Sequence, residues 1–146
     1  MENVTGVFED IIGNVNVEFR LAQLDPNGDC SNGITRTFST MTNQADDCIK
    51  DLINWDDTKY LNIWICDLAV SASGGMTLGY SYLPGLPSWQ AWKDGLVVDY
   101  QWFGTIQGSI GDGRTATHEI GHWLNLDHIW GDNNCGNDNV SDTPKQ

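Results

Sequence analysis

Hydrophobic residues follow two different periods along this chain, and each period predicts a different kind of element. In residues 4–12 they recur every three or four positions, which predicts an amphipathic helix that ends at Gly13. In residues 15–21 they alternate with polar residues, as is typical of a half-buried strand. Runs of β-branched and aromatic residues predict further strands over residues 33–40, 60–68, 78–83 and 95–100.

Two of these strands have a predicted place in a sheet. Residues 60–68 form the most aromatic and β-branched run, so we expect a central strand there. Residues 78–83 are followed by Pro84, which cannot donate a ladder hydrogen bond, so we expect an edge strand. The stretches 84–94 and 104–113 are predicted loops, and the apolar spacing of residues 115–126 predicts a second helix.

Length and charge narrow the class of protein. A chain of 146 residues favours one domain. The net charge of −13, with only seven scattered basic residues, argues against a nucleic-acid partner or an anionic membrane surface, because both need a Lys/Arg patch. The apolar runs are too short for a membrane span. The sequence leaves the oligomeric state open.

The four cysteines favour an oxidising compartment, in which a disulfide bond can form. Their spacing excludes a close CxxC pair, so a cysteine-based zinc site is not expected. Pairing of Cys30 with Cys48 and of Cys66 with Cys135 is one of three possible connectivities. In an alternative, Cys135 pairs elsewhere and Cys66 is a buried free thiol.

All three histidines of the chain lie within residues 118–128. His118 and His122 are four positions apart, so on a helix they share one face and can hold one metal ion, with Glu119 beside them to act on a water molecule. His128 cannot lie on the same straight helix face and needs a sharp turn near Asn125, a residue that tolerates the left-handed conformation. The alternative is three solvated or core histidines on an ordinary helix.

The HExxHxxxxxH pattern of residues 118–128 resembles the HExxHxxGxxH motif of metzincin zinc endopeptidases, with Asn125 in the place of the glycine. The chain resembles the pappalysin/cytophagalysin branch of that clan. The segments that carry this wider resemblance are 25–28, 33–36, 60–64, 94–98, 113–126, 128–132, 135–136 and 140–144. The resemblance implies an α/β (α+β) fold. Its sheet is twisted and mostly parallel, with an antiparallel edge strand over an active-site helix.

The resemblance also implies roles for particular residues. It implies that the chain is a secreted, zinc-dependent endopeptidase that acts on proteins or peptides outside the cell, with Glu119 as the general base. The zinc ligands would be His118, His122 and His128. The edge strand would bind an extended substrate by β-augmentation, through Leu78, Gly79, Tyr80 and Ser81. Because relatives bind calcium, one interpretation of Asp132, Asp138 and Asp142 is a structural calcium site, and the alternative is a solvated loop.

One feature departs from the metzincin pattern. Metzincins have a Met-turn beyond the third histidine, whereas the methionines here are Met1, Met41 and Met76. We therefore expect residues 1–146 to be one catalytic domain that holds the N-terminal (upper) subdomain and the start of a C-terminal subdomain, which is largely missing. Two rival functions stay open, namely a secreted calcium-dependent binding module and an inactive zinc-binding fragment of a metzincin.

Overall fold

The computed structural model describes residues 13, 15–70, 74–105, 110, 113–131, 133, 135–141 and 143. The helix predicted over residues 4–12 lies outside these residues. The chain divides into two units, residues 1–34 and 35–146, and each is described by itself. Among the described residues, no helix combines the length and the apolar character that a membrane span requires.

The described part of the first unit has an extended backbone with turns. The strand predicted over residues 15–21 is wrong, because the structure forms no strand there. Its alternating hydrophobic side chains stay 49–76% exposed at Val15, Val17, Phe19 and Leu21. An alternating segment becomes a strand only when a second strand accepts its backbone hydrogen bonds, and its own sequence does not provide that partner.

The second unit contains three strands, one α-helix and several 3-10 helices. Their bounds are η2 (Thr40–Thr42), η3 (Asp47–Asp51), β1 (Ile63–Cys66), β2 (Gly79–Ser81), η4 (Ser88–Lys93), β3 (Leu96–Asp99), η5 (Tyr100–Trp102) and α1 (Arg114–Trp123). The strand predicted over residues 33–40 is wrong, since that stretch has no regular structure until η2 begins. The predicted loop over residues 84–94 contains η4.

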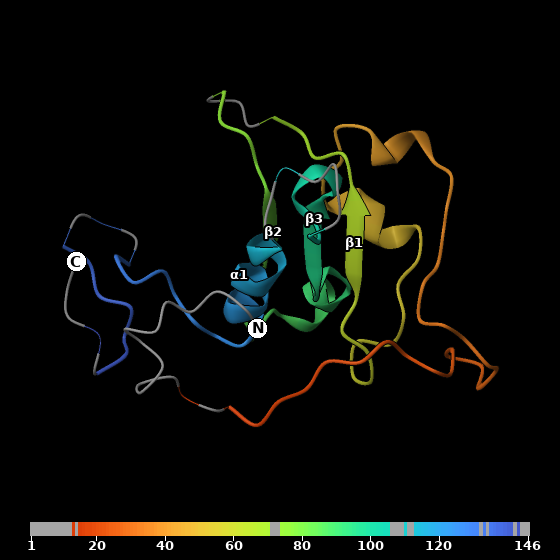
Figure 1. Cartoon of the computed structure of the whole chain (residues 1–146), viewed down its shortest axis with the longest axis horizontal. Coiled ribbons are helices and arrows are strands. Elements are labelled where there is room, and N and C mark those ends of the chain that lie inside the picture. Colours follow the sequence, from red (N-terminus) through yellow and green to blue (C-terminus); the bar gives the residue numbers. More distant parts are fainter. Residues whose placement is uncertain are drawn as a thin grey trace. The chain divides into compact units, whose positions relative to one another are not determined.

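The strands form a mixed sheet in the order β1-β3-β2 (Figure 1). β1 pairs with β3 in parallel and β2 pairs with β3 antiparallel, with Gly79 opposite Val98. The prediction of an antiparallel edge strand is therefore confirmed at β2. The prediction that residues 60–68 lie at the centre is wrong, because β3 is the middle strand and all four of its residues are buried.

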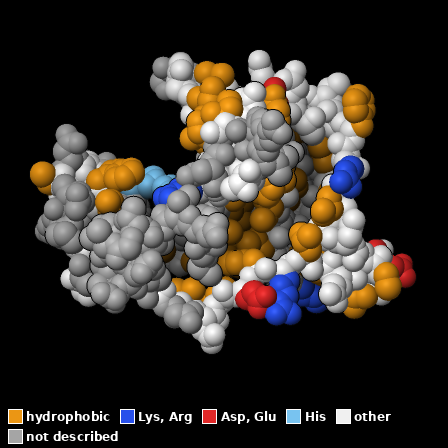
Figure 2. Space-filling model, viewed as in Figure 1, with side chains coloured by type: hydrophobic (Ala, Val, Ile, Leu, Met, Phe, Trp, Pro, Cys, Tyr) orange, Lys and Arg blue, Asp and Glu red, His pale blue; other side chains and the backbone are white. Residues whose placement is uncertain are grey.

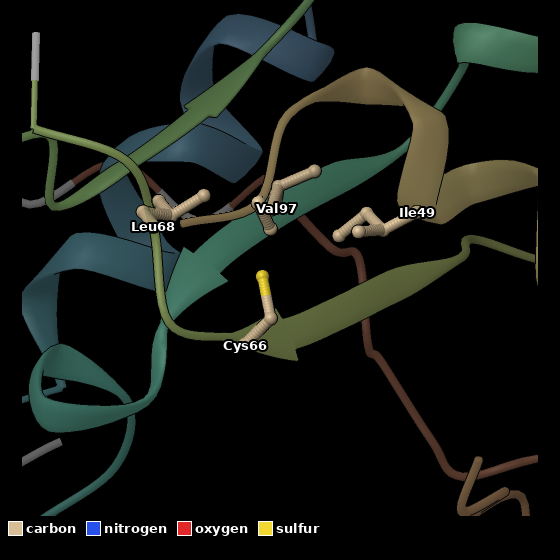
Figure 3. Close-up of a cluster of buried hydrophobic side chains, with 5 residues drawn as sticks. Ile49, Cys66, Leu68 and Val97 are labelled. Atoms are coloured by element: carbon tan, nitrogen blue, oxygen red, sulfur yellow. The ribbon is translucent and has the colours of Figure 1, made fainter. Parts of the chain in front are cut away.

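The two faces of β3 are covered by different elements. Successive side chains of a strand point to opposite faces, so Val98 faces α1 together with its partner Gly79, while Val97 faces the other way. Val97 packs in a small core with Ile49, Cys66, Leu68 and Ala45 (Figure 3). α1 packs against β2 and β3 on the opposite face (Figure 1). This packing places the metal-motif helix beside the edge strand.

The cysteines do not form the predicted disulfides. Cys30, Cys48 and Cys135 are exposed free thiols. Cys66 is also free, and its sulfur points into the core beside Val97 (Figure 3), as the alternative prediction had it. Burial raises the pKa of the Cys66 thiol to about 11, so it stays protonated at neutral pH.

A buried charge cluster joins η3 to β2 and was not predicted. Lys50 has no exposed side-chain surface, and its ammonium donates to the backbone carbonyl of Lys93 at 2.6 Å. It lies 3.5 Å from the carboxylate of Asp47, which also accepts the hydroxyl protons of Tyr80 at 3.0 Å and Tyr82 at 2.5 Å. Because β2 alternates, its tyrosine is fixed from this side while Gly79 and Ser81 face α1.

Candidate metal centre

The helix α1 begins at Arg114 and ends at Trp123, three residues earlier than predicted. It ends because Asn125 takes the left-handed conformation, with φ of 72°. The amide of Asn125 donates to the carbonyl of His122 at 2.8 Å, and the amide of Leu126 donates to that of Gly121 at 2.9 Å. The predicted turn at Asn125 is thus confirmed.

The turn brings the third histidine back to the first two. The Nε2 atoms of His118, His122 and His128 lie 3.0, 3.1 and 3.2 Å from one another. Four ligands at tetrahedral angles around zinc, with Zn–N distances of about 2.0–2.1 Å, lie about 3.3 Å apart. The donor set therefore fits a zinc ion. In the part of the chain that the structure describes, these histidines form the group that could hold a metal.

The hydrogen bonds and charges of the cluster favour the ligating form of its imidazoles. The Nδ1 of His122 lies 2.7 Å from the carbonyl oxygen of Leu126. A carbonyl only accepts, so the proton belongs on Nδ1 and the Nε2 lone pair is free for a metal. Burial, together with the nearby His122 and His128, lowers the pKa of His118, which favours its neutral form.

Glu119 lies at the same site and is almost completely buried, at 6% exposure. Burial raises the pKa of its carboxyl group, while His122 and the backbone N–H of Ser81 partly oppose that rise. The hydroxyl of Ser81 donates to the backbone carbonyl of Glu119 at 3.0 Å, so strand and helix are joined at this residue. A carboxyl group with a raised pKa is better suited to receive a proton near neutral pH.

A cleft of about 610 Å³ lies between the edge strand and the helix. It is lined by residues 76–81 and by Arg114, Thr115, His118, Glu119, His122 and His128. Part of the histidine cluster reaches the surface (pale blue in Figure 2), next to hydrophobic side chains. A metal ion and a peptide bond can therefore meet at an accessible place.

The structure brings the predicted substrate residues together with the predicted metal ligands. Leu78, Gly79, Tyr80 and Ser81 all line the cleft, although the strand itself begins at Gly79 and the hydroxyl of Tyr80 is bound to the buried charge cluster. Sequence reasoning missed Arg114 and Thr115 in the cleft wall. The signal was available, because they precede His118 and Glu119 by four positions and so share their helix face.

The predicted calcium residues are described only in part. Asp138 is buried at 6% exposure, and its carboxylate accepts the backbone N–H of Val140 at 3.1 Å. Asp132 and Asp142 lie outside the described residues. A calcium site here stays a prediction.

Solved structures of mirolysin resemble this chain closely. Mirolysin in complex with compound 9 superposes with a TM-score of 0.83 at 40% identity, covering 97% of this chain and 56% of that one. Mature mirolysin of Tannerella forsythia in complex with a cleaved peptide has a TM-score of 0.75 at 42% identity, covering 97% and 55%. The sheet, helix and histidine cluster described above thus belong to a known architecture.

Curated relatives agree with the solved structures. An extracellular metalloprotease of Verticillium alfalfae is 41% identical over 75 residues, which cover 47% of this chain and 26% of the relative. One of Colletotrichum graminicola is 40% identical over 75 residues, covering 46% and 26%. The matched regions therefore span about a quarter of these relatives.

The mixed sheet, the helix and the three-histidine cluster define a metzincin-type metalloprotease fold. Within that class, the chain belongs to the peptidase M43 family, described as pregnancy-associated plasma protein-A, whose model matches residues 43–146. The family resemblance seen in the sequence is confirmed.

Proposed function

We propose that this chain carries the catalytic centre of a zinc-dependent endopeptidase that hydrolyses extracellular proteins or peptides. The observation that carries the proposal is the convergence of three imidazole Nε2 atoms, 3.0–3.2 Å apart, beside a buried glutamate in one accessible cleft. His118, His122 and His128 hold the zinc, and Glu119 is the general base.

The residues divide the chemistry between them. Zinc, when bound, lowers the pKa of water and polarises a carbonyl group. Glu119 takes a proton from the attacking water and returns it to the departing amine. Its burial supports both steps, because a carboxyl group with a raised pKa holds the proton between them. The three imidazoles would bind the metal through their Nε2 atoms.

The edge strand supplies the place for the substrate. Among the strands that the structure describes, β2 pairs with β3 alone, so its other edge can form backbone hydrogen bonds with an extended peptide. Leu78, Gly79, Tyr80 and Ser81 would form the substrate-binding strand. Because the carbonyl of Leu78 accepts the amide of Asp99 on the β3 side, the backbone groups that face the other edge are those of Gly79 and Ser81. The hydrogen bond of Ser81 to Glu119 fixes this strand relative to the helix. Backbone hydrogen bonds do not distinguish one peptide sequence from another, so any preference for particular substrate side chains must come from the walls of the cleft.

The proposal includes the setting of the enzyme. Its curated relatives are called extracellular metalloproteases, which supports secretion of this protein. We assign residues 1–146 to one metzincin-type catalytic domain, made of the upper subdomain and the start of the C-terminal subdomain. A structural calcium ion held by Asp132, Asp138 and Asp142 is a secondary prediction, tested by a rise in melting temperature on adding calcium to chelator-treated protein.

One set of measurements tests the function and separates it from its rivals. Elemental analysis should find one zinc per chain, and His128→Ala should lose it. Cleavage of casein or gelatin should stop with a chelator and with Glu119→Ala, while the Glu119→Ala protein keeps its zinc. A binding module would contain no zinc, and an inactive fragment would bind zinc without cleavage. Proteolysis retained by Glu119→Ala would overturn the role of that residue.

A further inference from the structure

His128 and His122 differ in how their rings are held. His118 and His122 are fixed on α1, and His122 has a hydrogen bond from Nδ1 to a carbonyl oxygen. Histidine ligands normally have such a bond, since it fixes both tautomer and ring orientation. Across the residues that the structure describes, we find no hydrogen bond to the Nδ1 of His128.

An aromatic ring occupies the position where that support is needed. The indole of Trp130 stacks on the imidazole of His128 with a centroid distance of 4.6 Å and an interplanar angle of 9°. The two rings are nearly parallel, so the imidazole cannot rotate about its Cβ–Cγ bond without meeting the indole. That rotation is otherwise soft, because the final torsion of histidine has broad minima.

The backbone around Trp130 is held tightly enough to transmit this constraint. The amide of Gly131 donates to the carbonyl of His128 at 2.7 Å, closing a turn that contains both rings. Gly136 packs directly on this turn, since a Cβ atom there would lie only 2.0 Å from the carbonyl oxygen of Trp130. The indole is therefore positioned by the chain, although 51% of its surface is exposed.

We propose that Trp130 is a positioning residue for the third metal ligand, and that its stacking replaces the hydrogen bond that usually orients such a histidine. The inference rests on the proposed zinc site. Trp130 keeps the Nε2 of His128 aimed at the point where the other two Nε2 atoms converge. Losing the stack frees the ring and weakens zinc binding, without touching a ligand atom.

The test is zinc affinity in competition with a chromophoric chelator, measured on the full chain for the parent, Trp130→Leu and Trp130→Phe. Partners that orient a ligand typically change metal affinity 10- to 100-fold. Because the Trp130 ring that stacks on His128 is half exposed, we expect an effect at the lower end of this range, so Trp130→Leu should weaken zinc binding roughly tenfold. Trp130→Phe keeps an aromatic face and should stay within about threefold of the parent.

Two further measurements separate positioning from general stability. Trp89→Leu removes an equally large tryptophan that is 72% exposed on η4, and it should leave zinc affinity unchanged. The melting temperature of the metal-free protein should be alike for the parent and Trp130→Leu. In the cobalt-loaded proteins, the visible ligand-field bands should change for Trp130→Leu but not for Trp130→Phe.

The outcomes distinguish this inference from the function on which it rests. Parent protein that binds no zinc would overturn the proposed function itself. Parent protein that binds zinc, with Trp130→Leu within twofold of its affinity, would refute only the role of Trp130. If metal-free Trp130→Leu is unfolded, Trp130→Met and Trp130→Phe decide, and equal zinc affinities in those two variants would also refute it.

Discussion

The substitution Asp47→Asn removes a charge from the cluster that joins η3 to the edge strand. The carboxylate of Asp47 accepts hydrogen bonds from Tyr80, Tyr82 and Lys93 and lies 3.5 Å from the ammonium of Lys50. Asparagine has nearly the same shape and keeps one oxygen acceptor. The change therefore tests the charge and leaves the packing almost intact.

The expected cost follows from the burial of the two partners. Removing one member of a buried ion pair typically destabilises a protein by about 3–5 kcal/mol, because the other charge is left uncompensated. Lys50 has no exposed side-chain surface, whereas 20% of the Asp47 side chain is exposed. Lys50 also keeps the carbonyl of Lys93 at 2.6 Å. We therefore expect the lower end of the range, about 3 kcal/mol at pH 7.

The cost should depend on pH. Burial lowers the pKa of Lys50 and Asp47 opposes that fall, so the substitution lowers this pKa further. Between that value and the unfolded value of about 10.4, the unfolded chain binds more protons than the folded one, and stability rises with pH. The difference between Asp47→Asn and the parent should shrink as pH rises from 7 towards 10.

Urea unfolding, followed by tryptophan fluorescence, measures both effects. Asp56→Asn is the matched control, since it breaks an ion pair of 3.3 Å with Lys59 whose side chains are 41% and 70% exposed. That variant should change the free energy of unfolding far less, because water screens exposed charges. A cost for Asp47→Asn below about 1 kcal/mol, or one that is constant with pH, would refute this reasoning.

Three further predictions concern other features of the site and the core. Gly79→Ala places a Cβ 3.0 Å from Thr115 and 3.2 Å from Glu119, so it should cost about 1–3 kcal/mol in urea unfolding and lower proteolytic activity. Gly13→Ala, whose Cβ would lie in open space, should change neither the free energy of unfolding nor the proteolytic activity. Asn125→Val forces a β-branched residue into the left-handed region, so it should lower the free energy of unfolding by at least about 1–2 kcal/mol and weaken zinc binding. Asn125→Gly should preserve the free energy of unfolding and the zinc affinity. At pH 8, iodoacetamide should modify the three exposed cysteines quickly and Cys66 slowly. The pKa of Cys66 in the folded protein, about 11, lies above its value in the unfolded chain. The contribution of Cys66 to stability is therefore present below about pH 9 and lost between pH 9 and 11. Equal rates for all four thiols would contradict the assigned burial.

Local patterns predicted the metal centre better than they predicted the sheet. The spacing of His118 and His122 specifies one helix face, and Asn125 marked the turn that returns His128. Both depend on a few neighbouring residues, so the sequence contains the whole cause. The edge position of β2 was also predictable, because Pro84, which cannot donate a ladder hydrogen bond, follows the predicted strand.

Strand pairing depends on residues far apart, and there the predictions failed. Residues 15–21 have the alternation of a strand but no strand partner within the described part of their unit. The run over residues 60–68 is apolar enough for a central strand, yet β3 takes the centre because it has α1 on one face and the Val97 core on the other. Composition gives a segment its preference, and the available partners decide its place.

By itself, the sequence determined the family, and it predicted the three histidines of the candidate metal site, the glutamate beside them and the turn that brings them together. Helical spacing and backbone preference are local properties, so they can be derived residue by residue. Only the tertiary structure decided that Lys50 is buried against Asp47, that Trp130 stacks on His128, and that Gly79 and Ser81 contact the active-site helix. These contacts depend on how separate elements meet, and the free energy of that packing is shared among residues that no short stretch of sequence contains.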